Sequence, residues 1–272
     1  MLGLNNLVSS CTNSVTSNFP SESIHITDLL KTMATSNFVV SDDEQSLSQS
    51  LGYHIEKLIN ELLHPAQPSA KEFVTIGLSG GSLIKILSNI LPYLALPWAK
   101  IRFFFADERF VPFSSDDSTY HSYDKLFRQL PLTEKNICKI NPDVENVEQC
   151  AKDYETKLKE LLKEPEQSFD ILLLGMGPDG HTASLFPDHS ALNVSDGLVT
   201  YVKNSPKPPP ERVTLTLPTI NKSKHVLICA TGESKAQIVK EVIKDKSKQY
   251  PIGQVQGNNV SWYLDKQAAS QL

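Results

Sequence analysis

Residues 175–187 of the 272-residue chain form the segment best suited to chemistry, with the sequence GMGPDGHTASLFP. A histidine follows an aspartate by two residues in a glycine-rich loop, directly after the most apolar stretch of the chain. An imidazole titrates near neutral pH, which makes it a natural general base for activating water. A lone histidine is more often structural than catalytic, but a position at the end of a buried strand favours chemistry. We therefore predict that His181, with the acidic Asp179 beside it, is a catalytic base.

Two other glycine-containing segments have the composition of anion sites. Residues 78–82, LSGGS, and residues 231–235, TGESK, each run from the end of a predicted strand into the start of a predicted helix. Glycine lets backbone N–H groups approach an anion, and the helix N-terminus adds a partial positive charge. These features predict a phosphate site that includes Gly80, Gly81, Ser82 and Lys235. Each segment taken alone is equally compatible with a tight turn or an ordinary capped helix.

Two charged segments add candidates for the same site. The triplet DER at 107–109 follows a phenylalanine-rich run. Arg109 can bind phosphate in a forked geometry, and the acids Asp107 and Glu108 can orient that arginine or sugar hydroxyls, although a solvated loop is the alternative. The segment SPKPPPER at 205–212 precedes a predicted strand. We interpret it as a rigid loop that holds Lys207 and Arg212 near the site, in preference to a polyproline segment that binds a partner.

The elements that must position these residues alternate between strands and helices. Apolar and β-branched runs predict strands at 73–78, 101–105, 169–175, 198–202, 212–217 and 225–230, and helical spacing predicts helices at 44–62, 83–91, 118–130, 147–163 and 235–244. This alternation favours a doubly wound α/β fold, a mostly parallel sheet with helices on both faces. Ligands of such folds gather at the carboxyl ends of the strands. Ser82, Arg109, His181 and Lys235 are therefore expected on one rim, which indicates a small phosphorylated substrate and either hydrolysis or proton transfer.

Composition narrows the classes of function. The net charge is −5, with 40% hydrophobic and 21% charged residues, values of an ordinary globular protein that favour neither nucleic acid nor an anionic membrane. The four cysteines are scattered without zinc-ligand spacing, which suits a reducing compartment. No apolar run reaches the length of a membrane span. We expect no metal, no nucleic-acid or membrane partner, and a monomer or weak homo-oligomer.

The first 41 residues differ in composition from the rest. They are rich in Ser, Thr and Asn, lack arginine, and contain Lys31 as their one strong base. This composition is a poor secretory signal and a poor organelle transit peptide. We expect residues 1–41 to be a disordered extension, residues 42–272 to be a single domain, and the protein to be cytoplasmic. Targeting to an organelle by the extension stays open.

Taken together and in order, these motifs resemble those of the 6-phosphogluconolactonase family. They are LSGGSL at 78–83, ADER at 106–109 with DSTY at 117–120, GMGPDGHTASLFP at 175–187, SPKPPP at 205–210 and ATGESK at 230–235. The resemblance runs from about residue 42 to the C-terminus. It implies the α/β fold shared with glucosamine-6-phosphate deaminase and related to ribose-5-phosphate isomerase A. It also implies hydrolysis of 6-phosphoglucono-δ-lactone, the second step of the oxidative pentose phosphate pathway, without cofactor or metal.

The resemblance implies a role for each matching position. His181 is similar to the family's general base, and Asp179 helps to shape or orient the site. The positions expected around the substrate phosphate and ring are Gly80, Gly81, Ser82, Arg109 and Lys235, with Asp107, Lys207 and Arg212 as weaker candidates. The groups that stabilise the oxyanion stay unassigned.

Two rival functions differ from lactone hydrolysis in testable ways. A glucosamine-6-phosphate deaminase shares the fold and phosphate site, but its Asp-Gly-His typically continues as IAFNE, whereas residues 182–187 here read TASLFP. A catalytically inactive relative that binds partners through its proline-rich loop is the second rival. The presence of His181, Arg109 and Lys235 argues against inactivity.

Overall fold

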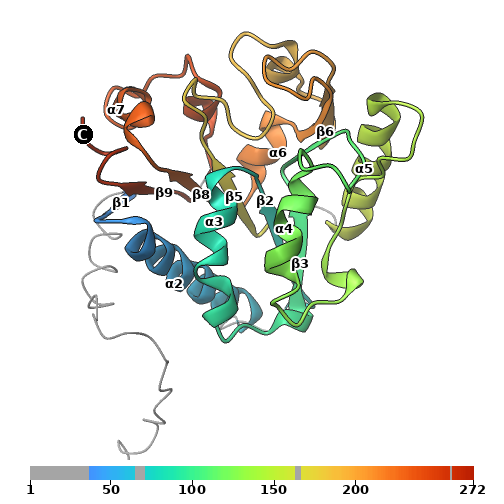
Figure 1. Cartoon of the computed structure of the whole chain (residues 1–272), viewed down its shortest axis with the longest axis horizontal. Helices are drawn as coiled ribbons and strands as arrows, with labels where there is room; N and C mark the ends of the chain where they lie inside the picture. The colour runs from blue at the N-terminus through green and yellow to red at the C-terminus, as the bar shows by residue number, and fades with distance from the viewer. Residues whose placement is uncertain (1–36, 65–70, 163–166, 258) are drawn as a thin grey trace, which may run out of the picture.

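A six-stranded parallel sheet forms the centre of the molecule (Figure 1). The computed structural model describes residues 37–64, 71–162, 167–257 and 259–272. In the order in which they lie across the sheet, the strands are β1 (Phe38–Ser41), β9 (Val260–Asp265), β8 (His225–Ala230), β5 (Ile171–Gly175), β2 (Val74–Leu78) and β3 (Ile101–Phe105). Each neighbouring pair is parallel. Since their carboxyl ends share one edge, loops that are distant in sequence meet there.

Alternating side chains of the strands pack into two separate cores, one on each face of the sheet. Phe104, Leu172 and Leu174 belong to one core, whereas Phe103 and Leu173 belong to the other. Successive side chains of a strand point to opposite faces, so strands that are apolar at every position require cover on both sides. The sequence-predicted doubly wound α/β fold is thereby confirmed.

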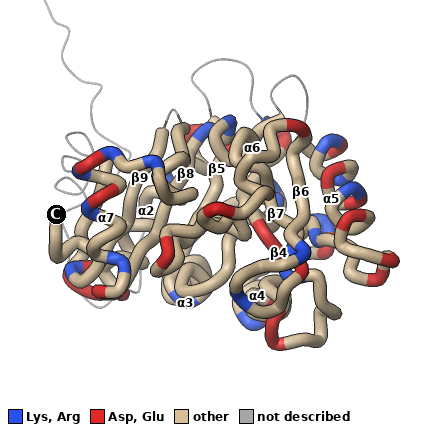
Figure 2. Tube along the Cα trace, turned by 90° about the horizontal axis from the view of Figure 1, so that it is seen from above, with Lys and Arg blue, Asp and Glu red and all other residues tan. Residues whose placement is uncertain are grey.

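The helices of the described residues cover the two faces of the sheet in two groups of three. Residues of α2 (Glu44–Leu63), α3 (Ser82–Ser88) and α4 (Thr119–Phe127) pack into one core, and residues of α5 (Val147–Leu161), α6 (Leu217–Lys222) and α7 (Ala236–Ile243) pack into the other. Short 3-10 helices lie at Leu91–Tyr93, Trp98–Lys100, Glu134–Asn136, Ser190–Asn193, Glu233–Lys235 and Pro251–Gln254. Seen from above, α7 and α5 lie at opposite ends of the molecule (Figure 2). Within the described ranges, no helix is long and apolar enough to cross a membrane.

A second, antiparallel sheet of three strands was not expected from the sequence. It contains β4 (Asp107–Arg109), β7 (Arg212–Leu215) and β6 (Val199–Val202), in that order. The polar triplet of β4 was predicted as a strand-end segment, but it pairs residue by residue with β7. In Figure 2 the acidic residues of β4 are seen in red beside β7. This small sheet brings the charged triplet and the start of β7 next to each other, although they are about a hundred positions apart in sequence.

Several boundaries differ from the sequence predictions. Phe38–Ser41 forms β1 and pairs with β9, so the expected disordered extension cannot include these residues; residues 1–36 lie outside the described ranges. The strand predicted at 212–217 ends at Leu215 because the Thr216 side chain caps α6, which has a proline in its first turn. The remaining predicted strands and helices are present with ends shifted by a few residues at most.

Candidate active site

The loops after β2 and β5 meet where the winding of the sheet reverses direction. The chain passes from β2 to β3 on one side and later enters β5 on the other side of β2. The Ser79 N–H donates to the carbonyl of Leu173 at 3.0 Å, which ties the first loop to β5. The carbonyl of Gly80 lies within van der Waals reach of a Cβ built at Gly175. Such a reversal point is the usual place for ligands in an open α/β sheet.

The loop after β5 folds back on itself and carries His181. The Gly177 N–H donates to the His181 carbonyl at 2.9 Å, and the Thr182 hydroxyl donates to the Gly175 carbonyl at 2.9 Å. Gly180 has φ +77°, a left-handed conformation that favours glycine. The Gly180 carbonyl accepts from the N–H of Ile252 at 3.0 Å. The loop is therefore fixed by its own backbone and by a second segment behind it.

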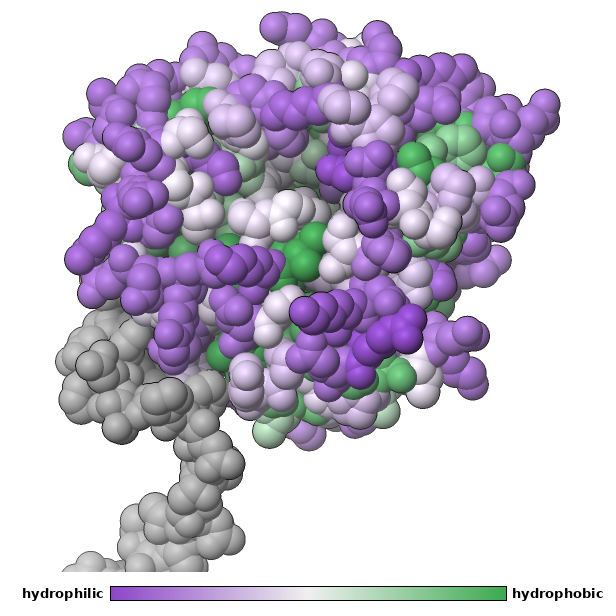
Figure 3. Space-filling model, in the orientation of Figure 1, coloured by the Kyte–Doolittle hydropathy of each residue, from purple (hydrophilic) through white to green (hydrophobic). Residues whose placement is uncertain are grey.

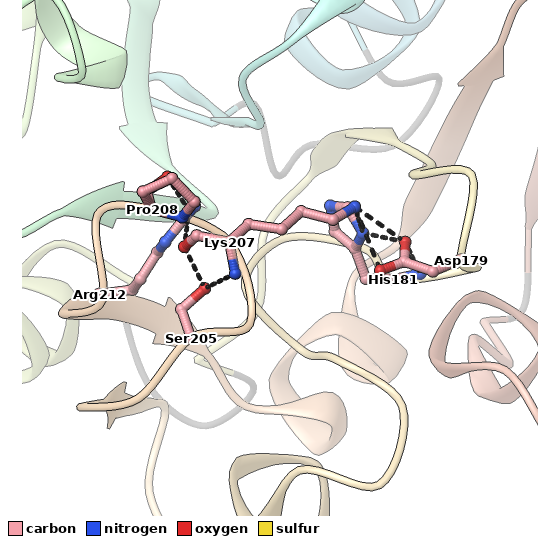
Figure 4. Close-up of polar contacts among 6 residues, drawn as sticks. All are labelled: Asp179, His181, Ser205, Lys207, Pro208 and Arg212. Carbon is pink, nitrogen blue, oxygen red and sulfur yellow. Dashed lines mark hydrogen bonds and ion pairs between the residues drawn. The ribbon is translucent and has the colours of Figure 1, made fainter.

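Three charged or titratable side chains converge at this loop (Figure 4). Nδ1 of His181 contacts a carboxylate oxygen of Asp179. The ammonium of Lys207, from the proline-rich loop, lies 3.1 Å from the Asp179 carboxylate and 3.1 Å from Nδ1 of His181. The imidazole side chain is 21% exposed, so solvent reaches it. The cluster contains one group able to accept a proton, one anion that orients it, and one cation.

The surroundings of His181 favour its neutral form. Burial lowers the pKa of the imidazole, and the hydrogen bond and charge of Asp179 offset this only in part. The charge of Lys207 lowers the pKa further, so the net value lies below that of an ordinary histidine. Burial raises the pKa of Asp179, but contacts with His181 and Lys207 outweigh it and the net pKa is lowered. At neutral pH the pair is a carboxylate beside an uncharged imidazole.

The proline-rich loop is held by Arg212 at the start of β7. Its guanidinium donates through Nε to the Pro209 carbonyl at 3.1 Å and through Nη2 to the carbonyls of Lys207 and Pro208, both at 3.0 Å. The residue is 4% exposed. The structure thus places the Lys207 ammonium beside Asp179 and His181, whereas Arg212 faces the loop that carries Lys207 (Figure 4).

The charged triplet of β4 is bound to its surroundings on the protein side. Asp107 is buried and accepts a hydrogen bond from the Ser184 hydroxyl at 2.7 Å. Glu108 accepts from the backbone N–H groups of Thr119 and Tyr120 at 2.6 and 2.7 Å. These are the free N–H groups at the beginning of α4, which a carboxylate satisfies well. Glu108 therefore anchors the helix to β4, and Ser184 anchors Asp107 to the His181 loop.

Arg109 lies beside this anchor with part of its guanidinium unsatisfied. Its Nη1 donates to the Asp117 carbonyl at 2.6 Å. Its Nε is buried without a hydrogen-bond partner among the described residues. Arg109 is also close enough to Arg212 to lower the pKa of the latter, after the larger effect of burial. The predicted cationic residues of β4 and β7 are therefore neighbours.

The two predicted anion loops lie at the carboxyl ends of β2 and β8. Gly81 has φ +73°, precedes α3, and would meet nothing within 4 Å if it carried a Cβ, so open space lies beside it. Lys235 follows Gly232, whose N–H donates to the Asp265 carboxylate at 3.0 Å. Burial lowers the pKa of Lys235, and the charge of Lys207 lowers it further. The Lys235 ammonium is thereby linked electrostatically to the His181 cluster.

Figure 3 shows a hollow near the centre of one face, with a pale floor and hydrophilic residues around it.

In the described part of the chain, no group of His, Cys, Asp and Glu has the arrangement of a metal site. Cys138, Cys150 and Cys229 are free thiols, and Cys11 lies outside the described ranges. Burial raises the pKa of Cys138 to about 11, so this thiol stays protonated at neutral pH.

Comparison with known protein sequences gives one family. Residues 42–263 match the family model described as glucosamine-6-phosphate isomerases/6-phosphogluconolactonase. The chain is 40% identical over 234 residues to human 6-phosphogluconolactonase, covering 82% of this chain and 90% of the relative. It is 39% identical over 261 residues to an Arabidopsis thaliana protein named 6-phosphogluconolactonase 3, chloroplastic, covering 89% of this chain and 80% of the relative.

Solved structures give the same result for the fold. The 6-phosphogluconolactonase from Thermotoga maritima superposes with a TM-score of 0.74 at 29% identity, covering 84% of this chain and 99% of the other. The enzyme from Trypanosoma cruzi gives 0.73 at 30% identity, covering 88% and 97%. A monomeric glucosamine-6-phosphate deaminase gives 0.70 at 22% identity, covering 86% and 99%, which is a likeness of fold alone.

Proposed function

Since the chain belongs to the glucosamine-6-phosphate isomerase/6-phosphogluconolactonase family, we propose that it hydrolyses 6-phospho-D-glucono-1,5-lactone to 6-phospho-D-gluconate. This reaction is a step of carbohydrate metabolism in the oxidative pentose phosphate pathway. The observation that carries the proposal is the contact between Asp179 and Nδ1 of His181. A carboxylate at this position accepts a hydrogen bond from Nδ1–H, which keeps the neutral imidazole protonated on Nδ1 and leaves Nε2 free to accept a proton from water.

The proposed reaction begins with the neutral imidazole. Nε2 of His181 removes a proton from water as the oxygen attacks the lactone carbonyl, which becomes a tetrahedral oxyanion. The bond from the carbonyl carbon to the ring oxygen then breaks, and the imidazolium returns its proton to that oxygen. Asp179 stabilises the imidazolium while it exists, and Lys207 opposes it, which favours the return of the proton. The products are the open-chain carboxylic acid and a free hydroxyl, so no cofactor takes part.

The phosphate of the substrate is proposed to lie between the two anion loops. Gly80, Gly81 and Ser82 offer backbone and side-chain donors next to open space, and Lys235 offers a positive charge. Arg109 supports the same assignment, since its guanidinium is not fully used within the protein. Asp107 keeps a candidate role toward sugar hydroxyls through the carboxylate oxygen that Ser184 does not occupy.

A direct comparison of two reactions tests the proposal. Opening of freshly generated 6-phosphogluconolactone, corrected for the uncatalysed rate, should be accelerated by the protein, whereas ammonia release from glucosamine 6-phosphate should not occur. His181→Ala should lower the turnover number by roughly 100-fold or more, the usual contribution of a general base. Near-normal turnover in that variant, measured on protein with native circular dichroism, would contradict the mechanism. Ammonia release by the unaltered protein would favour the deaminase.

The cellular location stays a prediction. Both human and chloroplastic relatives are similar to this chain, and we propose that the protein acts in the cytoplasm. Microscopy of the full chain carrying a C-terminal fluorescent tag tests this. Sedimentation of the purified protein tests the expected monomer or weak homo-oligomer.

A further inference from the structure

Arg212 has the chemistry of a substrate ligand, but its donors are turned toward the backbone of its own protein. Two of its nitrogens make the three bonds to the carbonyls of residues 207, 208 and 209. Its guanidinium also lies 5.8 Å from the ring centre of Phe186. The Phe186 ring is in turn 4.8 Å from the imidazole ring of His181. Arg212 therefore holds the loop that carries Lys207 and also lies near the Phe186 ring, which packs against the imidazole of His181.

The composition of the loop explains why an arginine is needed there. Residues 206–210 read PKPPP, and a proline has no backbone N–H. Such a loop presents carbonyl oxygens but almost no donors with which to brace itself. Within it, the Ser205 N–H bonds to the Pro210 carbonyl at 2.9 Å, and the Ser205 hydroxyl donates to the Lys207 carbonyl at 2.7 Å. A guanidinium, with five donors in a rigid plane, can satisfy several of the remaining oxygens at once.

We propose that Arg212 is a positioning residue, which fixes the backbone of residues 207–209 so that the Lys207 ammonium reaches Asp179 and His181. It binds the loop and not the substrate. The expected effect of Arg212 on catalysis rests on the proposed function. The geometric claim, that Lys207 reaches His181 only when Arg212 holds the loop, can be tested without any substrate.

Three charged groups face His181 and bear on that test. Asp179 comes from the same loop, Lys207 from the proline-rich loop and Asp107 from β4. Among them, Lys207 is the cation, and its charge lowers the pKa of the imidazole. A loop that no longer holds Lys207 in place should therefore raise the pKa of His181, even when the total charge of the protein is unchanged.

The test is the pKa of His181 in the free protein, measured by NMR titration of the imidazole Cε1–H signal. This signal is assigned by its absence from the spectrum of the His181→Asn variant. Arg212→Lys keeps the positive charge but cannot reach three carbonyls. It should raise the pKa of His181 in the same direction as Lys207→Met. In the Lys207→Met background, Arg212→Lys should cause no further rise. Arg102→Lys is the matched control, because Arg102 also donates to backbone carbonyls but at the opposite end of the sheet, and it should leave the His181 titration unchanged.

Two results would overturn the proposal. One is a His181 titration in Arg212→Lys identical to that of the unaltered protein. The other is an equal rise with and without Lys207, since the arginine would then act on His181 independently. If Arg212→Lys does not fold, Arg212→Gln, which retains two side-chain donors, replaces it in the same double-variant comparison. Because this variant also removes a positive charge, the shift that it causes in the Lys207→Met background is subtracted, and only the difference between the two backgrounds is attributed to positioning of Lys207.

Kinetics separates positioning from binding of the substrate. For a positioning residue, Arg212→Lys should lower kcat by about 10- to 100-fold, as for small displacements of a catalytic group, with KM nearly unchanged. A large rise in KM with unchanged kcat would identify Arg212 as a substrate ligand instead. If neither the unaltered protein nor any variant opens the lactone, the proposed function is wrong. The NMR titration still decides whether Arg212 positions Lys207.

Discussion

The backbone of Gly177 lies directly against the imidazole of His181. A Cβ built on this glycine would be 2.0 Å from Cε1 of the ring and 2.6 Å from a carboxylate oxygen of Asp179. No side chain fits in that space, so glycine is required for the histidine to lie over its own loop beside its aspartate. This contact places a steric requirement on the geometry of the proposed base.

We predict that Gly177→Ala displaces His181 and lowers kcat by about 100-fold, the effect of moving a catalytic group by roughly 1 Å. The structural reason is the overlap of the new methyl group with the imidazole. Steady-state kinetics on the lactone measures the loss, and circular dichroism verifies the fold. Gly175→Ala is the control, since its Cβ would make only an ordinary 3.6 Å contact. Equal losses in the two variants would contradict the steric explanation.

Opposite shifts of the pH profile are expected from the two neighbours of His181. The base must be neutral to act, so kcat/KM rises with pH through the pKa of the imidazole in the free enzyme. Asp179→Asn removes interactions that raise this pKa, so the acidic limb should move to lower pH. Lys207→Met removes a charge that lowers it, so the limb should move to higher pH.

The matched control for these charge changes is Lys203→Met, which removes an exposed lysine paired with Glu148. Its pH profile should coincide with that of the unaltered protein. Shifts of the same sign in Asp179→Asn and Lys207→Met would show that the rate does not follow the ionisation of His181.

Lys235→Gln should weaken recognition of the substrate phosphate. A charge-assisted hydrogen bond contributes roughly 1.5–3 kcal/mol, which corresponds to a rise in KM of about 10- to 100-fold. The comparison substrate is glucono-1,5-lactone, which lacks the phosphate and should be opened equally by both proteins. Lys240→Gln, on the same helix region but outside the predicted site, serves as the control. If Lys235→Gln impairs the opening of both lactones equally, Lys235 does not bind the substrate phosphate.

Asp170, at the amino end of β5, should matter for stability alone. Its buried carboxylate contacts Lys71, lies 3.4 Å from Lys224, and accepts from the N–H and hydroxyl of Thr75 at 3.0 and 3.1 Å. Asp170→Ala leaves the buried N–H and hydroxyl of Thr75 without the carboxylate that accepts from them and should lower the free energy of unfolding by roughly 3 kcal/mol. Urea denaturation measures this, with the surface variant Asp124→Ala as a control of much smaller effect. The KM of the folded fraction should stay unchanged, because Asp170 is at the end of the strand away from His181.

The parts of the fold predicted correctly from sequence are those determined by local patterns. The run Ile101–Phe105 is apolar at nearly every position, and it forms β3 with the predicted limits. The strand β4 escaped prediction because Asp107 and Glu108 are polar, and their strand conformation depends on pairing with β7. Pairing between segments far apart in sequence leaves no local periodicity to detect.

The candidate site likewise has parts that local sequence patterns predict and parts that depend on contacts between distant segments. The loop of His181 could be recognised from its glycines and its place after an apolar strand. The contact of Lys207 with Asp179 joins residues 28 positions apart, and no spacing rule predicts it. Ser184 and Glu108 bind within the protein to Asp107 and to the start of α4, and only the assembled sheet shows those partners. In the sequence, the one sign of a role for these residues is that Glu108 belongs to the charged triplet and Ser184 to the glycine-rich segment.

The strand β1 has a consequence for where the chain can be shortened. The family match begins at residue 42, but β1 already covers the outer side of β9 through residues 38–41. A protein that starts at Asp42 would leave the backbone groups of β9 unpaired along an open sheet edge, which is a template for pairing with another molecule. The edge strand would then be the six-residue β9 in place of the four-residue β1, and a longer exposed edge strand is a stronger template for pairing. Such a shortened protein should self-associate or aggregate with the His181 loop intact, so a boundary drawn from similarity alone would remove the short strand that covers β9.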